Sequence, residues 1–401
     1  MPRMSSPNLF HRARRAPLVA SFLLLTACGT VQDRTPPPSE LAGSLAIPGI
    51  PDARRWGDDG SPQIEAWMRR EDGEVRASFA EVCDREHSYL ALSGGGANGA
   101  FGAGLLCGWS ATGKRPKFTL VTGVSTGALA APFAFLGPDY DDELKEVYTT
   151  TRTRDIVEER TLLAALSGDS FYDTARLARM IERTITPELL EKIAVEHRKG
   201  RGLFIATTNL DAMRPVIWNF GAIAASDAPE KLALAHRVLL ASASIPLAFP
   251  PVLFDVDASD GKRYDELHVD GGATAQVFLY PLGVDWDAIE KKLGLRGRPE
   301  VFVIYNNKLE ASWNAIDPPC LTALIEPTMS SLIRTQGIGD LYRMYVGAQR
   351  DGLKFHLAHI PSDFQESQKE LFDKVYMTKL FERGFAQAQS GKPWLDEPPG
   401  M

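Results

Sequence analysis

The chain has 401 residues, of which 44% are hydrophobic, and its formal net charge is −7 at pH 7. A chain of this length can bury a large core, either as one large α/β unit or as two domains. An acidic protein gains nothing from phosphate-rich partners, so we expect no nucleic-acid partner. Charge alone would not bring it to an anionic membrane. Four cysteines are too few for a disulfide scaffold.

Residues 1–27 have the pattern of an export signal. Arg12, Arg14 and Arg15 form a basic start, and the apolar run 18–25 is too short for a stable membrane span. The run ends in Leu-Thr-Ala-Cys28, which resembles a bacterial lipobox. The resemblance implies cleavage before Cys28 and lipidation of this residue, which would anchor the protein in the bacterial cell envelope. By resemblance to sorted lipoproteins, Gly29 after the cysteine favours an outer membrane. The alternative for the whole segment is an ordinary signal peptide with an incidental cysteine.

Two segments are expected before the main domain. Residues 28–60 contain three consecutive prolines and no apolar period, which predicts a flexible tether. Residues 61–87 are expected to form a helical brace, with one helix from Ser61 to about Glu81 that places Ile64, Trp67 and Met68 on one face. The main domain is predicted over residues 88–395.

The main domain opens with two glycine-rich loops, each between a strand and a helix. The apolar strand 89–92 runs into the loop 93–99, and a helix over 100–109 follows, whose Gly102, Ala103 and Gly104 permit close helix–sheet contact. The strand 118–121 runs into Gly-Val-Ser125-Thr-Gly, and a second helix begins at once. This βαβ crossover predicts a parallel sheet with both loops at its carboxyl edge.

The later elements complete an α/β pattern. Asp260 and Gly261 predict the turn of a hairpin whose second strand enters Asp270-Gly-Gly. Further helices are predicted over 139–151, 173–182, 186–200, 229–243 and 377–388, and further strands over 203–207, 215–220 and 301–305.

The two loops carry residues suited to acyl transfer. A serine between glycines on a strand-to-helix turn is typical of a nucleophile elbow, so Ser125 is the candidate nucleophile. The backbone amides of Gly95 and Gly96 can stabilise the developing oxyanion. Asp270, at a strand end, is the candidate base, and partial burial would raise its pKa toward a useful value. The alternative for Asp270-Gly-Gly is a simple turn.

Three ordered motifs, residues 94–99, 123–127 and 270–272, resemble the signatures of patatin-like phospholipases. Residues 241–246 resemble the Ser/Pro block of that family, and the likeness spans about residues 88–310. The resemblance implies an α/β fold, a three-layer sandwich with a mostly parallel central sheet, that hydrolyses lipid acyl esters without a cofactor or metal.

The resemblance also implies the role of each site residue. Ser125 would be the nucleophile and Asp270 the proton acceptor, without a catalytic histidine. The oxyanion hole would be formed by Gly94, Gly95 and Gly96, and the motifs are completed by Gly99, Gly123, Gly127, Gly271 and Gly272. Asn98 stands where the family usually has Arg or Lys, so a positive charge for phosphate-bearing substrates is missing.

Rival interpretations use the same residues. An α/β-hydrolase would keep Ser125 and add His268, His356 or His359 to form a Ser-His-Asp triad. A catalytically inactive envelope lipoprotein that binds lipid or a protein partner is another class. Dinucleotide binding needs an acid near residues 117–122, where the chain has none, and a P-loop needs lysine at Ala100.

Two metal-site patterns are also present in the sequence. His356 and His359 could form a pair on one helical face, but the sequence shows no third ligand. Residues 255–266 partly match a calcium loop, although Asp260 occupies the position that requires glycine. A polar hairpin is the better interpretation of this second segment.

Overall fold

The computed structural model describes residues 34–59, 62–159, 170–281, 283–311, 313, 315–317 and 321–401. The predicted signal sequence and Cys28 lie outside the described residues, as do residues 29–33 of the predicted tether.

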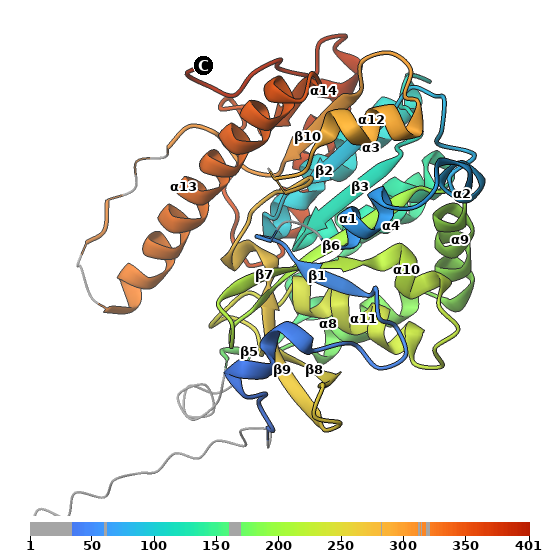
Figure 1. The fold of residues 1–401 in the computed structure, drawn as a ribbon. Coiled ribbons are helices and arrows are strands. Elements are labelled where there is room, and N and C mark those ends of the chain that lie inside the picture. The colour runs from blue at the N-terminus through green and yellow to red at the C-terminus, as the bar shows by residue number, and fades with distance from the viewer. Residues whose placement is uncertain are drawn as a thin grey trace, which may run out of the picture.

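A nine-stranded sheet forms the centre of the described part of the chain (Figure 1). Five neighbouring strands run parallel in the order β6-β3-β2-β10-β11, and β7, β1, β9 and β8 join the β6 end in antiparallel pairs. These strands are β1 Arg54–Trp56, β2 Ser88–Leu92, β3 Leu120–Val124, β6 Gly202–Asn209, β7 Arg214–Asn219, β8 Val252–Asp257, β9 Arg263–Asp270, β10 Glu300–Tyr305 and β11 Lys354–His359. A separate two-stranded ladder pairs β4 Glu158–Glu159 with β5 Tyr172–Asp173.

The central strands are apolar on both faces, and their side chains alternate between two helical layers. In β2, Leu90 and Leu92 belong to one hydrophobic cluster, whereas Tyr89 and Ala91 belong to another. The first layer contains α3 Gly99–Ala111, α4 Thr126–Leu136, α5 Asp141–Thr150, α6 Thr153–Ile156, α8 Ala175–Thr184, α9 Pro187–Arg198, α10 Phe220–Ala225, α11 Lys231–Ser242 and α14 Lys374–Gln389. The second contains α12 Trp286–Leu293 and α13 Leu321–Arg350. The first turns of α13 project away from the other elements (Figure 1). The predicted α/β fold, a three-layer sandwich with a mostly parallel central sheet, is confirmed.

The crossover from β2 through α3 to β3 lies at the position in the chain that the pattern predicted. Tyr89 pairs with Leu120 in parallel register, so Ser93 and Ser125 both follow the carboxyl ends of adjacent strands. α3 and α14 pack so closely that a Cβ on Gly104 would lie only 2.0 Å from the Phe381 carbonyl oxygen. Gly104 therefore serves a helix–helix contact rather than the predicted helix–sheet contact.

Residues 34–59 fall within the predicted flexible tether, yet they lie packed against the domain. Arg34 forms ion pairs with Asp211 at 2.6 Å and with Asp265 at 2.9 Å. The short 3-10 helix Ser39–Ser44 follows, and β1 then pairs with β7. Ile47, Ile50 and Ala53 are also buried in the main hydrophobic cluster, but their spacing follows neither a helical nor a strand period that the sequence could reveal.

The predicted helix of the brace is divided into α1 Pro62–Met68 and α2 Asp72–Ser78. The break lets the rings of Trp67 and Phe79 meet edge to face, with centroids 5.7 Å apart. Val75 and Cys83 pack with Leu293 of α12. The brace therefore covers the α12 side of the sheet.

The strand β11 is absent from the sequence prediction, which expected mixed helix in this region. Phe355 and Leu357 are buried in the layer of α13, and His356 stacks on Phe302 with ring centroids 4.7 Å apart. The alternation of apolar side chains over only six residues was too short to distinguish strand from helix. In the described part of the chain, no helix is both long and apolar enough to cross a bilayer.

Candidate functional site

The first glycine loop is held against the end of β10 by Asn306. The Asn306 side-chain amide donates to the Ser93 carbonyl at 2.9 Å, and its Oδ1 accepts from the Gly102 amide at 3.0 Å. Gly95 has φ +154°, and a Cβ there would lie 2.5 Å from the Asn306 carbonyl oxygen. Only glycine therefore fits at position 95.

The second loop is a sharp turn with Ser125 at its tip. Ser125 has φ +54° and ψ −124°, an unfavourable backbone conformation for a residue with a side chain. A Cβ on Gly123 would lie 2.5 Å from the Gly127 carbonyl oxygen, and a Cβ on Gly127 would lie 2.5 Å from the Leu92 carbonyl oxygen. The two glycines thus let the strand and α4 pass close together, as a nucleophile elbow requires.

Ser242 holds the backbone of the elbow in place. Its hydroxyl accepts from the Ser125 amide at 3.0 Å and donates to the Ala206 carbonyl at 2.7 Å. Ser242 is fully buried and ends α11, so this contact links the elbow to a distant helix and to β6. It lies in the block 241–246, to which the sequence assigned no individual role.

The two loops are in direct contact. A Cβ on Gly94 would lie 3.3 Å from the Ser125 Cβ, and a Cβ on Gly99 would lie 2.1 Å from the Thr126 hydroxyl oxygen. The Thr126 hydroxyl in turn forms a hydrogen bond of 2.8 Å with Tyr148 of α5. The geometry brings the glycine loop beside Ser125 without space for larger residues.

Asp270 ends β9 at the same edge of the sheet, where its carboxylate lies near the Ser125 side chain. The Asp270 amide donates to the Ser244 carbonyl at 2.8 Å, and its Oδ1 accepts from the Gly272 amide at 2.7 Å. Burial raises the pKa of Asp270 to about 7, although the hydrogen bonds from Ser125 and Gly272 act in the opposite direction. A carboxylate with such a pKa is suited to accept a proton near neutral pH.

The glycines after Asp270 are also confined. A Cβ on Gly271 would lie 2.6 Å from the Ala206 carbonyl oxygen, and one on Gly272 would lie 2.8 Å from the Gln276 side-chain nitrogen. This turn therefore fixes the Asp270 carboxylate against β6.

The backbone amides of the glycine loop are not equivalent. The Gly94 amide donates to the Gln276 carbonyl at 3.0 Å, so it is not free to bind an oxyanion as the sequence predicted. Within the described residues, the amides of Gly95 and Gly96 donate to no acceptor. These two amides, beside Ser125, are the available donors.

Gln276 connects the first glycine loop with the Asp270 turn, and no sequence signal singled it out. Besides accepting from Gly94, it donates from its side chain to the Gly272 carbonyl at 2.7 Å. Its own amide donates to the buried carboxylate of Asp340 at 2.7 Å. Burial raises the pKa of Asp340 to about 6. The residue types alone could not reveal this network, because it depends on how α13 packs on the loop.

Asn98 is neutral and engaged with its neighbours. Its side chain donates to Asn307 at 3.4 Å and accepts from the Tyr376 hydroxyl at 2.6 Å. The position that usually carries a basic residue in the resembled family thus links the glycine loop to α14.

The candidate histidines make other contacts. His268 is buried between Thr207, at 2.9 Å, and Glu266, at 3.2 Å. His356 of β11 lies between the carboxylates of Glu300 and Asp396, each 3.8 Å away. His359 forms a hydrogen bond with the Ile360 carbonyl. In the described part of the chain, no histidine forms a hydrogen bond with Ser125 or Asp270, so the geometry does not assemble a Ser-His-Asp triad.

The metal-site patterns do not assemble either. His356 and His359 lie on a strand, where a spacing of three places them on opposite faces instead of on one helical face. Asp255 and Asp265 pair across the β8–β9 hairpin, which is the predicted polar hairpin. Over the described residues, no group of three or more His, Cys, Asp or Glu side chains could hold a metal ion.

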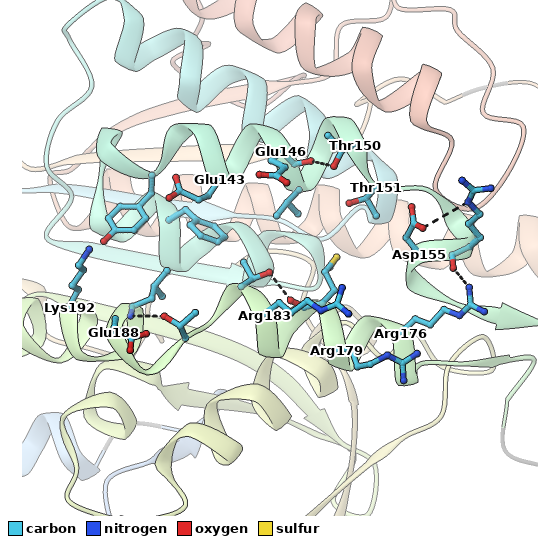
Figure 2. A pocket seen from close by; sticks show the side chains of 18 residues that line it. Glu143, Glu146, Thr150, Thr151, Asp155, Arg176, Arg179, Arg183, Glu188 and Lys192 are labelled. Atoms are coloured by element: carbon cyan, nitrogen blue, oxygen red, sulfur yellow. Dashed lines mark hydrogen bonds and ion pairs between the residues drawn. The ribbon is translucent and has the colours of Figure 1, made fainter.

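A charged hollow of about 840 Å³ lies between α5 and the pair α8 and α9 (Figure 2). Arg176, Arg179 and Arg183 line one side, and Glu143 and Glu146 line the other. Neither the Ser125 elbow nor the glycine loop lines this hollow. It is therefore separate from the candidate active site.

Comparison with known proteins agrees with the motifs. Residues 90–282, slightly less than half of the chain, match the family model of patatin-like phospholipases. No curated protein matches. Among solved structures, the chain is similar to VipD from Legionella pneumophila, with 11% identity, a TM-score of 0.37, and coverage of 77% of this chain and 67% of VipD.

A second similar structure is the human GIVD cytosolic phospholipase A2. The identity is 11% and the TM-score 0.29, and the match covers 78% of this chain and 53% of that one. The chain thus spans about half the length of this second structure.

Proposed function

Residues 90–282 belong to the patatin-like phospholipase family, and from this premise we propose that the protein is a membrane-tethered serine esterase that cleaves lipid acyl esters with a Ser125–Asp270 dyad. The family supports a lipid acyl hydrolase. The observation that carries the finer proposal is the approach of the Ser125 side chain to the buried carboxylate of Asp270 at one edge of the sheet, beside the amides of Gly95 and Gly96, which donate to no acceptor in the described part of the chain.

In the first half of the reaction, Ser125 forms an acyl-enzyme. Its Oγ attacks the ester carbonyl while Asp270 accepts the hydroxyl proton. The tetrahedral oxyanion receives hydrogen bonds from the Gly95 and Gly96 amides. The C–O bond then breaks, and the protonated Asp270 returns the proton to the leaving alcohol.

In the second half, water releases the acyl group. Asp270, again a carboxylate, accepts a proton from a water molecule that attacks the acyl carbonyl. The same two amides stabilise the second oxyanion. Collapse restores the Ser125 hydroxyl, with the proton from Asp270, and releases a fatty acid.

The test is hydrolysis of a panel of phospholipid, lysolipid and short p-nitrophenyl esters. Ser125→Ala and Asp270→Asn are expected to reduce turnover by about 10³-fold or more while the far-UV circular dichroism stays unchanged. Ser390→Ala, which changes an exposed serine after α14, is the matched control. Near-normal turnover by Asp270→Asn would contradict the dyad.

Labelling with a fluorophosphonate probe separates an esterase from an inactive binding protein. The wild type is expected to react at Ser125, and Ser125→Ala is expected to remain unlabelled. A wild-type protein that neither labels nor hydrolyses any ester of the panel would instead favour the lipid- or partner-binding alternative. His268→Ala, His356→Ala and His359→Ala, if each retains labelling, would exclude the triad.

We also propose that the carboxyl edge of the sheet faces a lipid surface in the bacterial envelope. Arg34 is held by Asp211 and lies six positions after Cys28, the proposed lipidation site. Six extended residues reach about 20 Å at most. Beside Asp211, Met213 is 82% exposed, and Leu247 is 56% exposed three residues after Ser244, which binds Asp270.

A further inference from the structure

A second cavity of about 570 Å³ lies away from the proposed dyad, between the sheet, residues 274–281 and the second half of α13. Its walls are largely apolar and include Ile217, Phe278, Leu279, Val301 and Met344. Ser125, Asp270 and the glycine loop do not line it. The cavity is of the size that commonly holds a small ligand, about 300–1,000 Å³.

Arg55 is one of the residues that line this cavity. Arg55 pairs with Ile217 in the β1–β7 ladder, and alternation along β1 directs its neighbour Arg54 to the opposite face. There Arg54 forms an ion pair with the buried Glu266. The two adjacent arginines thus have different surroundings.

Arg55 has no counter-ion in the part of the chain that the structure describes. Its Nη1 is buried without a hydrogen-bond partner, and among the described residues no side chain forms an ion pair with it. The guanidinium carbon of Arg55 lies 6.0 Å from the centroid of the Phe204 ring. Burial lowers the pKa of Arg55 to about 10, so the group remains charged at neutral pH.

Two acids of the cavity wall already have arginine partners, one of which, Arg343, also lines the cavity. Asp58 pairs with Arg214 at 2.7 Å, and Asp340 pairs with Arg343 at 3.1 Å. Arg55 is partly buried, and its buried Nη1 leaves a charged hydrogen-bond donor unsatisfied, which is costly. The cavity therefore presents one unpaired cation beside apolar walls.

We propose that this cavity binds a long-chain fatty acid, with its carboxylate on Arg55 and its hydrocarbon chain against Ile217, Phe278 and Met344. A guanidinium can bind a carboxylate through two hydrogen bonds. A head group with a single charge fits best, since Asp58, Asp59 and Asp340 also line the cavity and would repel a doubly charged phosphate. A fatty acid is also the product of the proposed hydrolysis.

The test measures binding rather than turnover. Titration calorimetry of the full-length Ser125→Ala protein with monomeric palmitate is expected to show saturable binding, which Arg55→Gln weakens at least tenfold and Arg55→Lys weakens less. Hexadecanol has the same chain without the charge, so it should bind both Ser125→Ala and Ser125→Ala/Arg55→Gln within about twofold. Arg69→Gln, on the surface of the brace, is the control for a lost positive charge.

Each outcome decides the proposal. Equal palmitate affinity with and without Arg55→Gln, when circular dichroism shows both proteins folded, would overturn it. Tighter, Arg55-dependent binding of lysophosphatidate than of palmitate would overturn the choice of a carboxylate. Because the protein used cannot form an acyl-enzyme, a failure of the proposed hydrolysis would leave this test unaffected.

Discussion

At the scale of single residues, the chemistry depends on the surroundings of Asp270. An exposed aspartate has a pKa near 3.9 and is a poor base for serine. Burial at the end of β9 raises the pKa of Asp270 to about 7, and the Ser125 hydroxyl and the Gly272 amide keep the carboxylate oriented. The proposed activity should therefore titrate with this group.

We expect kcat/KM for a soluble p-nitrophenyl ester to rise about tenfold per pH unit below pH 7 and to level off above it, because Asp270 acts as a carboxylate. A pH–rate profile from pH 5 to 9 measures this. A plateau that continued down to pH 5 would show that the proposed base is not a group with a raised pKa.

The same raised pKa predicts a stability effect. The folded protein binds the Asp270 proton more tightly than the unfolded chain, so folding is disfavoured as the pH rises from about 4 to about 7. Asp270→Asn should therefore increase the free energy of unfolding at pH 8, by up to about 1.36 kcal/mol per pKa unit, and much less at pH 4.5. Urea denaturation at both values measures the difference. Ser125→Ala keeps the carboxylate but removes a hydroxyl that lowers the pKa of Asp270, so its free energy of unfolding should fall between pH 4.5 and pH 8 at least as much as that of the wild type.

Ser242 offers a second prediction at this scale. Ser242→Ala removes the acceptor of the Ser125 amide and should lower kcat by up to about tenfold, the equivalent of one hydrogen bond. Ser244→Ala is the matched control, since its hydroxyl donates only to the Leu240 carbonyl of α11. Equal kcat for the two variants would mean that Ser242 does not position the elbow.

At the scale of elements, close backbone approach determines how the helices meet their neighbours. α3 touches α14 through glycine on both sides, since a Cβ on Gly384 would lie 2.2 Å from the Phe101 carbonyl oxygen. The same principle brings α4 against β2 at Gly127. Small residues at these crossings hold the helices at fixed distances from the two loops.

Gly104→Ala tests the contact between α3 and α14. Its Cβ would meet the Phe381 carbonyl oxygen, so we expect a loss of about 1–3 kcal/mol in the free energy of unfolding. Gly73→Ala is the control, because nothing lies within 4 Å of its Cβ in α2 and alanine favours a helix by about 1 kcal/mol. Thermal and urea unfolding should move in opposite directions for the two variants.

At the scale of the whole molecule, one edge of the sheet gathers the features of the proposed lipid contact. Ser125 and Asp270 lie at this edge, and Met213 and Leu247 are exposed on loops there. Arg34 is bound to the same edge through Asp211 and Asp265. If Cys28 is anchored in a membrane, the short segment between Cys28 and Arg34 keeps this edge close to the membrane surface.

The orientation can be measured with a fluorophore on introduced cysteines in vesicles that contain brominated lipid. The full-length protein used for labelling carries Cys320→Ser, which removes one native thiol. The fluorescence of a label at Met213→Cys or Leu247→Cys should be quenched at least twofold more than that of a label at Val346→Cys. Val346 is 55% exposed in the C-terminal half of α13 and serves as the control. Equal quenching at all three positions would exclude the proposed orientation, whatever the enzymatic activity.

Sequence alone determined the features that rest on local pattern. Strand, glycine loop and helix follow each other within a few residues in both β2–α3 and β3–α4, and the chain between them fixes a parallel crossover. The apolar runs of β6 and β10 and the hairpin β8–β9 were identified for the same reason. Local conformation and hydrophobic period are properties of neighbouring residues, so they can be read without a fold.

Only the tertiary structure decided which groups meet. Ser242 under the elbow, the Gly94 amide bound to Gln276 and the ion pairs of Arg34 join segments far apart along the chain. The unpaired Arg55 also depends on the pairing of β1 with β7. These contacts carry no local periodicity, because they are set by the register of distant strands and by what each buried polar group finds within hydrogen-bonding distance.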